Sequence, residues 1–407
     1  MSGEPGRSRQ LSRKWYLSRR TRRRTRISGF IPLLRMRRML SLRRLGSSLS
    51  IRFFVDGRVL PVITGLVLSV PRNLNKGNGW ITLSDRLTSI ELCAGAGGQA
   101  LGLERAGFEH LALVEIDEHC VKTLEANRPR WKGRIHGDLK TFDASPFKGV
   151  DLLAAGLPCP PFSVAGKQLG EKDERNLFPE ALRIIDECQP RAIMIENVRG
   201  ILDAVFKDFR GNIKSALESR GYNVDFQLVN ASDYGVPQLR PRVIFVALRK
   251  ELWDQFEWPK SRKKPPTVGD ALYPMMAANG WKGAGKWKKL ADGIAPTIVG
   301  GSKKHGGPDL GPTRAREQWR TLHVNGSKLA ETAPTASFVG NPLLTVPMVA
   351  LIQGFPAHWQ FVGKKTHAYR QVGNAFPPPV AAAHGRSIAR ALRTQKRKLR
   401  LPFEDVA

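Results

Sequence analysis

The first feature that could do covalent chemistry is a cysteine held between prolines. Cys159 lies in the segment Pro158-Cys-Pro-Pro161, which follows the apolar run 150–155. Prolines stiffen a loop, and a nucleophile has to be positioned accurately, so this setting suits a reactive thiolate. A single cysteine is more often a buried core residue, but the three prolines at a strand end favour a functional role.

A glutamate is the natural partner of that thiolate. Glu196 ends a second apolar run, 192–195, and precedes Asn197. If the two runs are neighbouring parallel strands, their ends bring Glu196 beside Cys159, where it can act as a general acid. The plainer alternative is a solvated or helix-capping glutamate. The remaining cysteines form no Cys-x-x-Cys pair, so neither a metal site nor a disulfide framework is predicted, and a reducing compartment fits best.

A glycine-rich loop predicts a nucleoside-containing cofactor. The stretch Cys93–Gly98 lies between an apolar run and a helical pattern, where glycines permit a tight turn close to a ligand. Glu115 follows the next apolar run, about 20 residues on, in a position suited to ribose hydroxyls. Asp138 offers a further carboxylate for an adenine amino group. This pattern alone does not distinguish NAD from S-adenosylmethionine.

The elements that position these residues are those of a parallel sheet. Short apolar runs alternate with helical stretches, which predicts an α/β fold with helices on both faces of the sheet. The last two runs, joined by a turn-rich segment, are expected to form a terminal hairpin. The predicted strands are 89–93, 111–115, 150–155, 192–195, 224–229 and 243–248, and the predicted helices are 98–106, 119–127, 178–188 and 380–393.

Charge and composition divide the chain and point to a polyanionic partner. The 407 residues include 66 Lys and Arg against 35 Asp and Glu, a net charge of +31, of which +17 lies in the first 88 residues. Such a surplus favours nucleic acid as the partner. No apolar stretch reaches the roughly 18 residues of a membrane span. The expected organisation is a basic, disordered extension (1–84), an α/β core (85–249), an irregular region (250–340), a return to the core (341–395) and a basic tail (396–407).

Taken together, the ordered motifs resemble the DNA (cytosine-5) methyltransferase family from about Ser89 to Arg393. The motifs are Cys93–Gly98, Pro158-Cys159 with Phe162-Ser163, Arg175–Phe178, Glu196-Asn-Val198, Gln238-x-Arg240-x-Arg242, Gln353-Gly-Phe-Pro356 and Gln371-Val-Gly-Asn374. The resemblance implies a Rossmann-like sheet of the S-adenosylmethionine-dependent methyltransferases. It also implies that residues 250–340 are a small target-recognition domain.

The resemblance also implies a role for each motif. Cys159 would be the nucleophile, Glu196 would act at cytosine N3, and Arg240 and Arg242 would support the catalytic loop and the base. The residues expected to bind S-adenosyl-L-methionine are Leu92, Cys93, Ala94, Gly95, Gly97, Glu115, Ile116, Asp138, Leu139, Pro158 and Asn374. The expected partner is double-stranded DNA with a flipped-out base. The protein is further expected to be a monomer in the bacterial cytoplasm, associated with the nucleoid. A separate restriction endonuclease is expected to accompany it.

Two departures from the family pattern and three alternatives stay open. Leu92-Cys93 stands where the family usually has phenylalanine, and Pro347 stands where an arginine often braces the recognition domain. The nearest alternative is an RNA (tRNA) cytosine-5 methyltransferase with the same pocket. A catalytically inactive DNA-binding homologue is the second. An NAD-dependent oxidoreductase would explain the glycine loop, but neither the Pro-Cys-Pro loop nor the basic region.

Overall fold

The chain divides into two compact units, which are described separately. The computed structural model describes residues 86–158, 176–261, 264–300 and 309–398, together with four short strands between residues 41 and 59. The first unit, Met1–Leu83, contains those strands. They form two antiparallel pairs, β1 (Ser41–Leu45) with β2 (Ser48–Arg52), and β3 (Phe54–Val55) with β4 (Arg58–Val59). Sequence analysis had predicted no regular structure in this extension.

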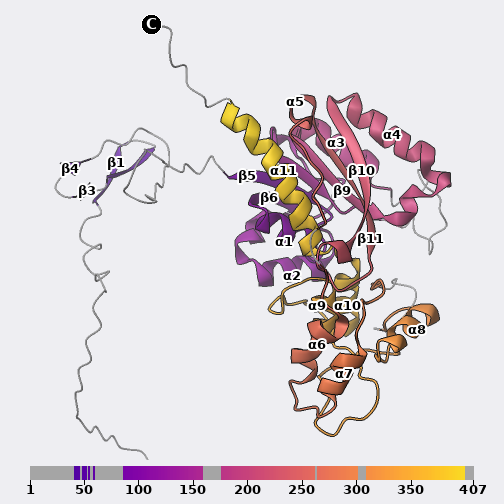
Figure 1. The fold of residues 1–407 in the computed structure, drawn as a ribbon. Coiled ribbons are helices and arrows are strands. Elements are labelled where there is room, and N and C mark those ends of the chain that lie inside the picture. The colour runs from indigo at the N-terminus through magenta and orange to yellow at the C-terminus, as the bar shows by residue number, and fades with distance from the viewer. Residues whose placement is uncertain are drawn as a thin grey trace, which may run out of the picture. The chain divides into compact units, whose positions relative to one another are not determined.

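The second unit, Ser84–Ala407, is built on a seven-stranded mixed sheet (Figure 1). The strands, in sheet order, are β10 (Tyr222–Asn230), β11 (Pro241–Arg249), β9 (Ala192–Val198), β8 (Leu152–Ala155), β5 (Leu87–Leu92), β6 (Phe108–Val114) and β7 (Ile135–His136). The pairs from β9 to β7 are parallel, whereas β11 runs antiparallel to both β9 and β10. The α/β fold and the terminal hairpin are therefore confirmed.

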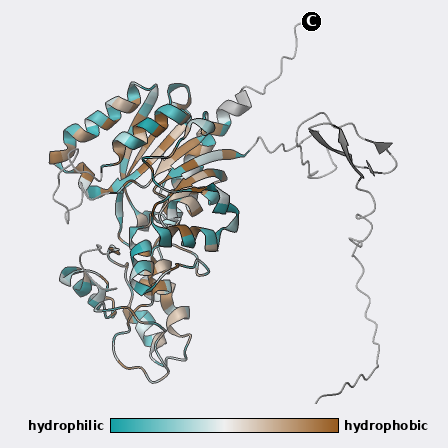
Figure 2. Cartoon of the chain, turned by 180° about the vertical axis from the view of Figure 1, so that it is seen from behind, coloured by the Kyte–Doolittle hydropathy of each residue, from teal (hydrophilic) through white to brown (hydrophobic). Residues whose placement is uncertain are grey.

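Helices cover both faces of this sheet because each strand presents apolar side chains in both directions. On β8, Leu152 and Ala154 pack in the cluster with α1 and α11, whereas Leu153 and Ala155 pack in the cluster with α3 and α4. Figure 2 shows the resulting apolar strands between helices with polar outer surfaces. The helices of this core are α1 (Gly98–Arg105), α2 (Glu118–Asn127), α3 (Phe178–Cys188), α4 (Lys207–Glu218), α5 (Lys250–Trp253), α9 (Val346–Ile352), α10 (Lys365–Asn374) and α11 (Pro378–Lys398).

Besides α5, the described part of the irregular region contains three short helices, which lie around buried tryptophans. These helices are α6 (Val268–Met276), α7 (Ala284–Leu290) and α8 (Thr313–Thr321), which lie with α9 and α10 at one end of the sheet (Figure 1). The indole N–H groups of Trp281 and Trp287 donate to the carbonyls of Phe338 and His323, both at 2.9 Å. Tryptophan side chains thus fix a backbone that has few regular hydrogen bonds.

Short 3₁₀ turns complete the described elements. They are η3 (Pro129–Arg134), η4 (Ser145–Phe147), η6 (Arg199–Leu202), η7 (Ala204–Phe206) and η8 (Ala231–Asp233). Among the residues that the structure describes, no helix is long and apolar enough to cross a membrane. Those same residues contain no cluster of three metal-ligating side chains.

Candidate active site

The carboxyl ends of β8 and β9 bring Pro158 and Glu196 to the same side of the sheet. The two strands are parallel neighbours, and their register pairs Ala155 with Ile195. Glu196 is therefore one residue beyond the pair that ends β8, and Pro158 follows on an exposed turn. Cys159 itself lies outside the described residues, as does the rest of the segment 159–175. This edge is where open α/β sheets bind their ligands.

Glu196 is held by an arginine from the adjacent antiparallel strand. Arg242 Nε lies 2.7 Å from Glu196 Oε1, and the two side chains are only 12% and 10% exposed. The strand β11 supplies this arginine because its register places Arg242 opposite Val198 and Ile244 opposite Glu196. A carboxylate that is removed from water in this way needs a charged partner, and the guanidinium supplies that charge, although its Nε–H is not aligned for a hydrogen bond.

Arg240 serves a different purpose from Arg242, although the two were predicted to act together. Its side chain is 1% exposed and donates to three backbone carbonyls. Nη1 donates to Ile298 at 2.8 Å, and Nη2 donates to Gly373 at 2.8 Å and Ala375 at 3.1 Å. Arg240 thus joins the irregular region to the end of α10, and among these contacts none is to Glu196.

The glycine-rich loop follows β5 and opens α1 with an unusual backbone. Cys93, Gly95 and Gly97 have φ angles of 55°, 55° and 82°. A Cβ on Gly97 would lie 2.7 Å from Leu124 Cδ2, and one on Gly98 would overlap the carbonyl oxygen of Phe376. These positions require glycine, whereas Cys93 adopts the left-handed region despite its side chain. Of the other predicted cofactor residues here, Leu92 and Ala94 are buried.

The predicted ribose and adenine carboxylates follow the next two strands. Glu115 accepts the Gly95 N–H at Oε2 and the Asp117 N–H at Oε1, both at 2.7 Å. Burial raises the pKa of the Glu115 carboxyl, and these N–H groups act in the opposite direction. Ile116 is 73% exposed beside it, an unusual setting for a large apolar side chain.

Asp138 and Leu139 lie on the turn after β7, the edge strand. The Asp138 side chain is exposed and accepts the Lys140 N–H at 2.9 Å, whereas Leu139 is buried. Asn374, at the end of α10, is also exposed, and a Cβ on Gly300 would overlap its Oδ1 atom. The strand order β8-β5-β6-β7 therefore places the predicted cofactor residues in a row along one edge of the sheet.

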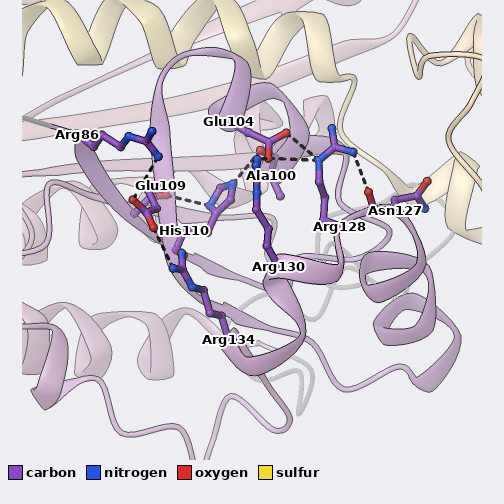
Figure 3. A network of polar contacts seen from close by, with 10 residues as sticks. Arg86, Ala100, Glu104, Glu109, His110, Asn127, Arg128, Arg130 and Arg134 are labelled. Carbon is purple, nitrogen blue, oxygen red and sulfur yellow. Dashed lines mark hydrogen bonds and ion pairs between the residues drawn. The ribbon is translucent and has the colours of Figure 1, made fainter. Parts of the chain in front are cut away.

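A second polar cluster lies at the amino ends of the strands, on the opposite side of the sheet from the carboxyl ends that carry this site. Arg128 and Arg130 contact Glu104, and Arg134 contacts Glu109 at 2.9 Å (Figure 3). A cavity of about 370 Å³ opens between these side chains, near the amino ends of β5 and β6. Because its two carboxylates are already paired with arginines, the cluster supports the fold rather than a reaction centre.

Two glutamines that sequence reasoning left without a role join the site to the irregular region. Gln238 Nε2 donates to Gln353 Oε1 at 2.7 Å, and Gln238 Oε1 accepts the Ile298 N–H at 2.9 Å. Both glutamines are fully buried, and both lie in motifs quoted above, so their sequence positions were a usable signal. Pro347 lies exposed in the first turn of α9, a position that proline favours. The glutamine pair and Arg240, rather than a residue at position 347, connect the irregular region to the core.

Comparison with known proteins agrees with this geometry. The family model described as C-5 cytosine-specific DNA methylase matches residues 87–390. Type II methyltransferase M.NgoMIV of Neisseria gonorrhoeae is 51% identical over 313 residues, which are 76% of this chain and 99% of that protein. Type II methyltransferase M.NaeI of Lentzea aerocolonigenes is 50% identical over 312 residues, 75% of each chain.

Solved structures show the same fold at lower identity. The methyltransferase EhMeth of Entamoeba histolytica superposes with a TM-score of 0.53 at 16% identity, covering 77% of this chain and 99% of its own. A protein encoded within an Escherichia coli prophage gives 0.53 at 24% identity, covering 75% and 99%. From its motifs, its fold and these matches, the chain belongs to the C-5 cytosine-specific DNA methylase family, whose enzymes are DNA (cytosine-5-)-methyltransferases that use S-adenosyl-L-methionine.

Proposed function

We propose that this protein methylates carbon 5 of cytosine in a specific DNA sequence, with Cys159 as the nucleophile and Glu196 as the acid. The single observation that carries these roles is the Arg242–Glu196 pair at the end of β9, one strand away from the Pro158 turn. This ion pair places a carboxyl group at the carboxyl end of β9, beside the end of β8 that leads to Pro158. The family membership supplies the reaction, and the pair supports the assignment of residues.

The reaction needs a nucleophile because cytosine carbon 5 does not attack a methyl sulfonium by itself. The Cys159 thiolate adds to carbon 6, which breaks the aromaticity of the ring and makes carbon 5 an enamine carbon. Electron density moves to N3 in this step, and Glu196 donates a hydrogen bond and a proton there. After methylation, the carbon 5 proton is lost to a base, Cys159 leaves carbon 6 as a thiolate, and the N3 proton returns to Glu196, which restores the neutral aromatic ring.

The residues along the carboxyl edge fit an adenosyl cofactor. Gly95 has nothing within 4 Å of a Cβ placed on it, so the loop leaves open space beside its backbone. Glu91 is 1% exposed, its Oε2 atom has no hydrogen-bond partner among the described residues, and burial raises its pKa well above the ordinary value. When bound, S-adenosyl-L-methionine supplies the methyl group. Glu115 would hold the ribose and Ile116 would cover the adenine.

Further members of the cofactor set complete this proposal. Asp138 and Leu139 would contact the adenine, Asn374 would lie at the methionine end, and Pro158 would lie between cofactor and base. The loop Leu92–Gly97 would contribute mainly its backbone, since Leu92 and Ala94 are buried.

Residues 250–340 are proposed to read the DNA sequence. Residues 249–320 hold 15 basic and 7 acidic side chains. On α7, Trp287 is buried while Lys286 and Lys289 are exposed, so one face packs and the other is available for phosphates. The cytosine has to leave the duplex before the site can reach its ring atoms. Exchanging this region for that of a relative with another target is expected to move the methylated site.

We further propose that the protein is the modification enzyme of a restriction-modification system and acts as a monomer in the bacterial cytoplasm. The names of the similar proteins, type II methyltransferases of bacteria, support this role. A cognate endonuclease would act separately on the same sequence. An RNA cytosine-5 methyltransferase is disfavoured because the matching family model describes DNA methylases. An NAD-dependent oxidoreductase does not belong to that family.

Bisulfite sequencing of DNA from a host that expresses the protein tests this proposal. Protection of cytosines within one recurring sequence is the expected result. Complete conversion of every cytosine would contradict it. Transfer of tritium from labelled S-adenosylmethionine to DNA, measured against transfer to RNA, separates the active DNA enzyme from both an RNA enzyme and an inactive DNA-binding homologue.

A further inference from the structure

We propose that Arg183 and Glu187 on α3 are positioning residues for cofactor recognition, because they hold the loop that carries Asp138. This inference rests on the proposed role of Asp138 at the adenine amino group. Neither residue contacts the reacting atoms. Their effect would be to set where the Asp138 carboxylate lies, and so how well the protein distinguishes adenine from other bases.

The loop after β7 receives little support from the sheet. The strand β7 has only two residues, Ile135 and His136, and it is the edge of the sheet. A cavity of about 370 Å³, lined by residues between His136 and Phe147, lies against one side of the loop. Edge position and incomplete packing both lower the cost of local movement. The exposed Asp138 side chain therefore depends on contacts from elsewhere.

Arg183 provides those contacts through its two terminal nitrogens. Nη2 donates to the carbonyl of Leu139 at 3.0 Å, and Nη1 donates to the carbonyl of Phe142 at 3.1 Å. The two carbonyls belong to the turn that begins at Asp138. A planar guanidinium can reach both with fixed geometry, which a lysine ammonium cannot reproduce.

Glu187 completes the contact and orients the arginine. Its Oε2 atom accepts the Ala144 N–H at 2.9 Å, and its Oε1 atom contacts Arg183 Nη1. Glu180, one turn earlier on α3, accepts from Arg183 Nε at 2.8 Å. The guanidinium is thus fixed by two carboxylates of its own helix, and three backbone groups of the loop are bound to α3.

Such bracing favours binding because a loop that is already ordered loses less entropy when the ligand binds. It also places one carboxylate where it can accept from an adenine amino group. A hypoxanthine ring presents a carbonyl oxygen at that position, which would repel the Asp138 carboxylate. Discrimination between the two bases therefore reports directly on the position of Asp138.

The experiment measures the dissociation constants of S-adenosylhomocysteine and S-inosylhomocysteine for the full-length protein by calorimetry. Wild type is expected to prefer the adenine compound by about tenfold or more. Arg183→Met should weaken binding of the adenine compound about tenfold and remove most of this preference, while kcat at saturating S-adenosylmethionine stays near wild type. Arg183→Lys should recover only part of the preference.

Arg220→Met is the matched control. Arg220 also binds a carboxylate of α3, with Nε donating to Asp186 Oδ1 at 2.7 Å, yet none of its described contacts is to the 138–144 loop. The preference of Arg220→Met for the adenine compound over the hypoxanthine compound should equal that of wild type. Glu187→Ala keeps Arg183 but loses the Ala144 contact and one of the two carboxylates that orient the arginine. It should reduce the preference in the same direction, and it provides the test if Arg183→Met does not fold.

Two outcomes would overturn the inference, and they are distinguishable. If Asp138→Asn loses the preference but Arg183→Met and Glu187→Ala keep it, the bracing role is wrong and the cofactor proposal stands. If wild type shows no preference, or Asp138→Asn keeps it, the role proposed for Asp138 is itself wrong, and the inference falls with it.

Discussion

Arg242 Nε lies 2.7 Å from Glu196 Oε1, across two antiparallel strands. One oxygen of the carboxyl group therefore lies against the guanidinium, and the proposed chemistry at cytosine N3 is assigned to the other. Burial and this ion pair distinguish Glu196 from a solvated surface carboxylate.

Glu196→Gln is expected to reduce methylation strongly while leaving DNA binding nearly intact. Glutamine has almost the same shape and can still donate a hydrogen bond to N3, but it has no proton to transfer. Loss of general-acid help costs about 10²–10⁴-fold, or roughly 3–5 kcal/mol of barrier. Single-turnover methylation measures the rate, and the DNA dissociation constant should change less than about tenfold. A variant that methylates at the wild-type rate would make Glu196 a structural residue.

Arg242→Met is expected to act through Glu196, so the two substitutions should not be additive. Removing the guanidinium leaves a largely buried carboxylate without its partner, which lowers the rate in the wild-type background. In the Glu196→Gln background the same change should cost less, with a coupling of about 1 kcal/mol or more in a double-mutant cycle. The exposed Lys214–Glu218 pair on α4 gives a control cycle with no effect on turnover. Additive effects at Glu196 and Arg242 would argue against a functional pair.

Cys159 should be trapped by DNA that contains 5-fluorocytosine. Fluorine cannot leave carbon 5 as a cation, so the adduct persists and survives denaturing electrophoresis. Cys159→Ala should give no such band. Alanine variants of Cys93, Cys120 and Cys188 should all give it. Burial raises the pKa of the Cys120 thiol well above its ordinary value and raises the pKa of the Cys188 thiol to about 12, which disfavours both thiolates. A trapped band in Cys159→Ala would refute the assignment.

Deletion of residues 1–84 should leave turnover nearly unchanged. The second compact unit begins at Ser84, and M.NgoMIV is matched over 99% of its length by only 76% of this chain. Because the first 88 residues carry +17 of the net charge, their loss should weaken non-specific DNA binding and reduce its dependence on salt. Methylation rate and binding at several salt concentrations check both parts. Loss of folding on deletion would show that the enzyme needs this segment.

Stability should fall as the pH drops from 6.5 toward 4, in part through two buried histidines. Burial lowers the pKa of His110 and of His384 to about 4, from the ordinary value of 6.5. A depressed histidine pKa contributes stability that is complete above the unfolded value and is lost as pH falls through that window, at up to about 3 kcal/mol for each residue. His384→Leu should therefore flatten the pH dependence of urea unfolding relative to wild type. If the unfolding free energy of His384→Leu varies with pH as steeply as that of wild type, the contribution assigned to His384 is wrong.

The apolar runs were enough to predict most of the sheet, because buried strands need continuous apolar sequence on both faces. The run 192–195 became β9, and the last two runs became the hairpin. The two-residue strand β7 was too short to leave a hydrophobic pattern of its own. In the irregular region, α7 and α8 are short and each buries a single tryptophan, whereas the short helix α6 buries Val268, Leu272 and Met276.

At the site, the contacts that could not be predicted from the sequence are those between segments far apart in the chain. The strand ends predicted that Glu196 would face the Pro-Cys loop, since neighbouring parallel strands share one edge. Nothing in the local sequence distinguishes Arg240 from Arg242, yet the first is buried on backbone carbonyls and the second binds Glu196. The same holds for Arg183, whose backbone acceptors Phe142 and Leu139 lie 41 and 44 residues away.

The glycine-rich loop packs against segments that lie far along the chain. A Cβ on Gly98 would overlap the carbonyl of Phe376, and Trp359 Nε1 donates to the carbonyl of Ala96, 263 residues earlier, at 3.2 Å. During synthesis, the strand that begins the sheet leaves the ribosome long before α11 exists to cover it. A nascent chain therefore cannot complete the proposed cofactor site until Phe376 has been synthesised, and termination upstream of that residue would give a product that lacks this packing.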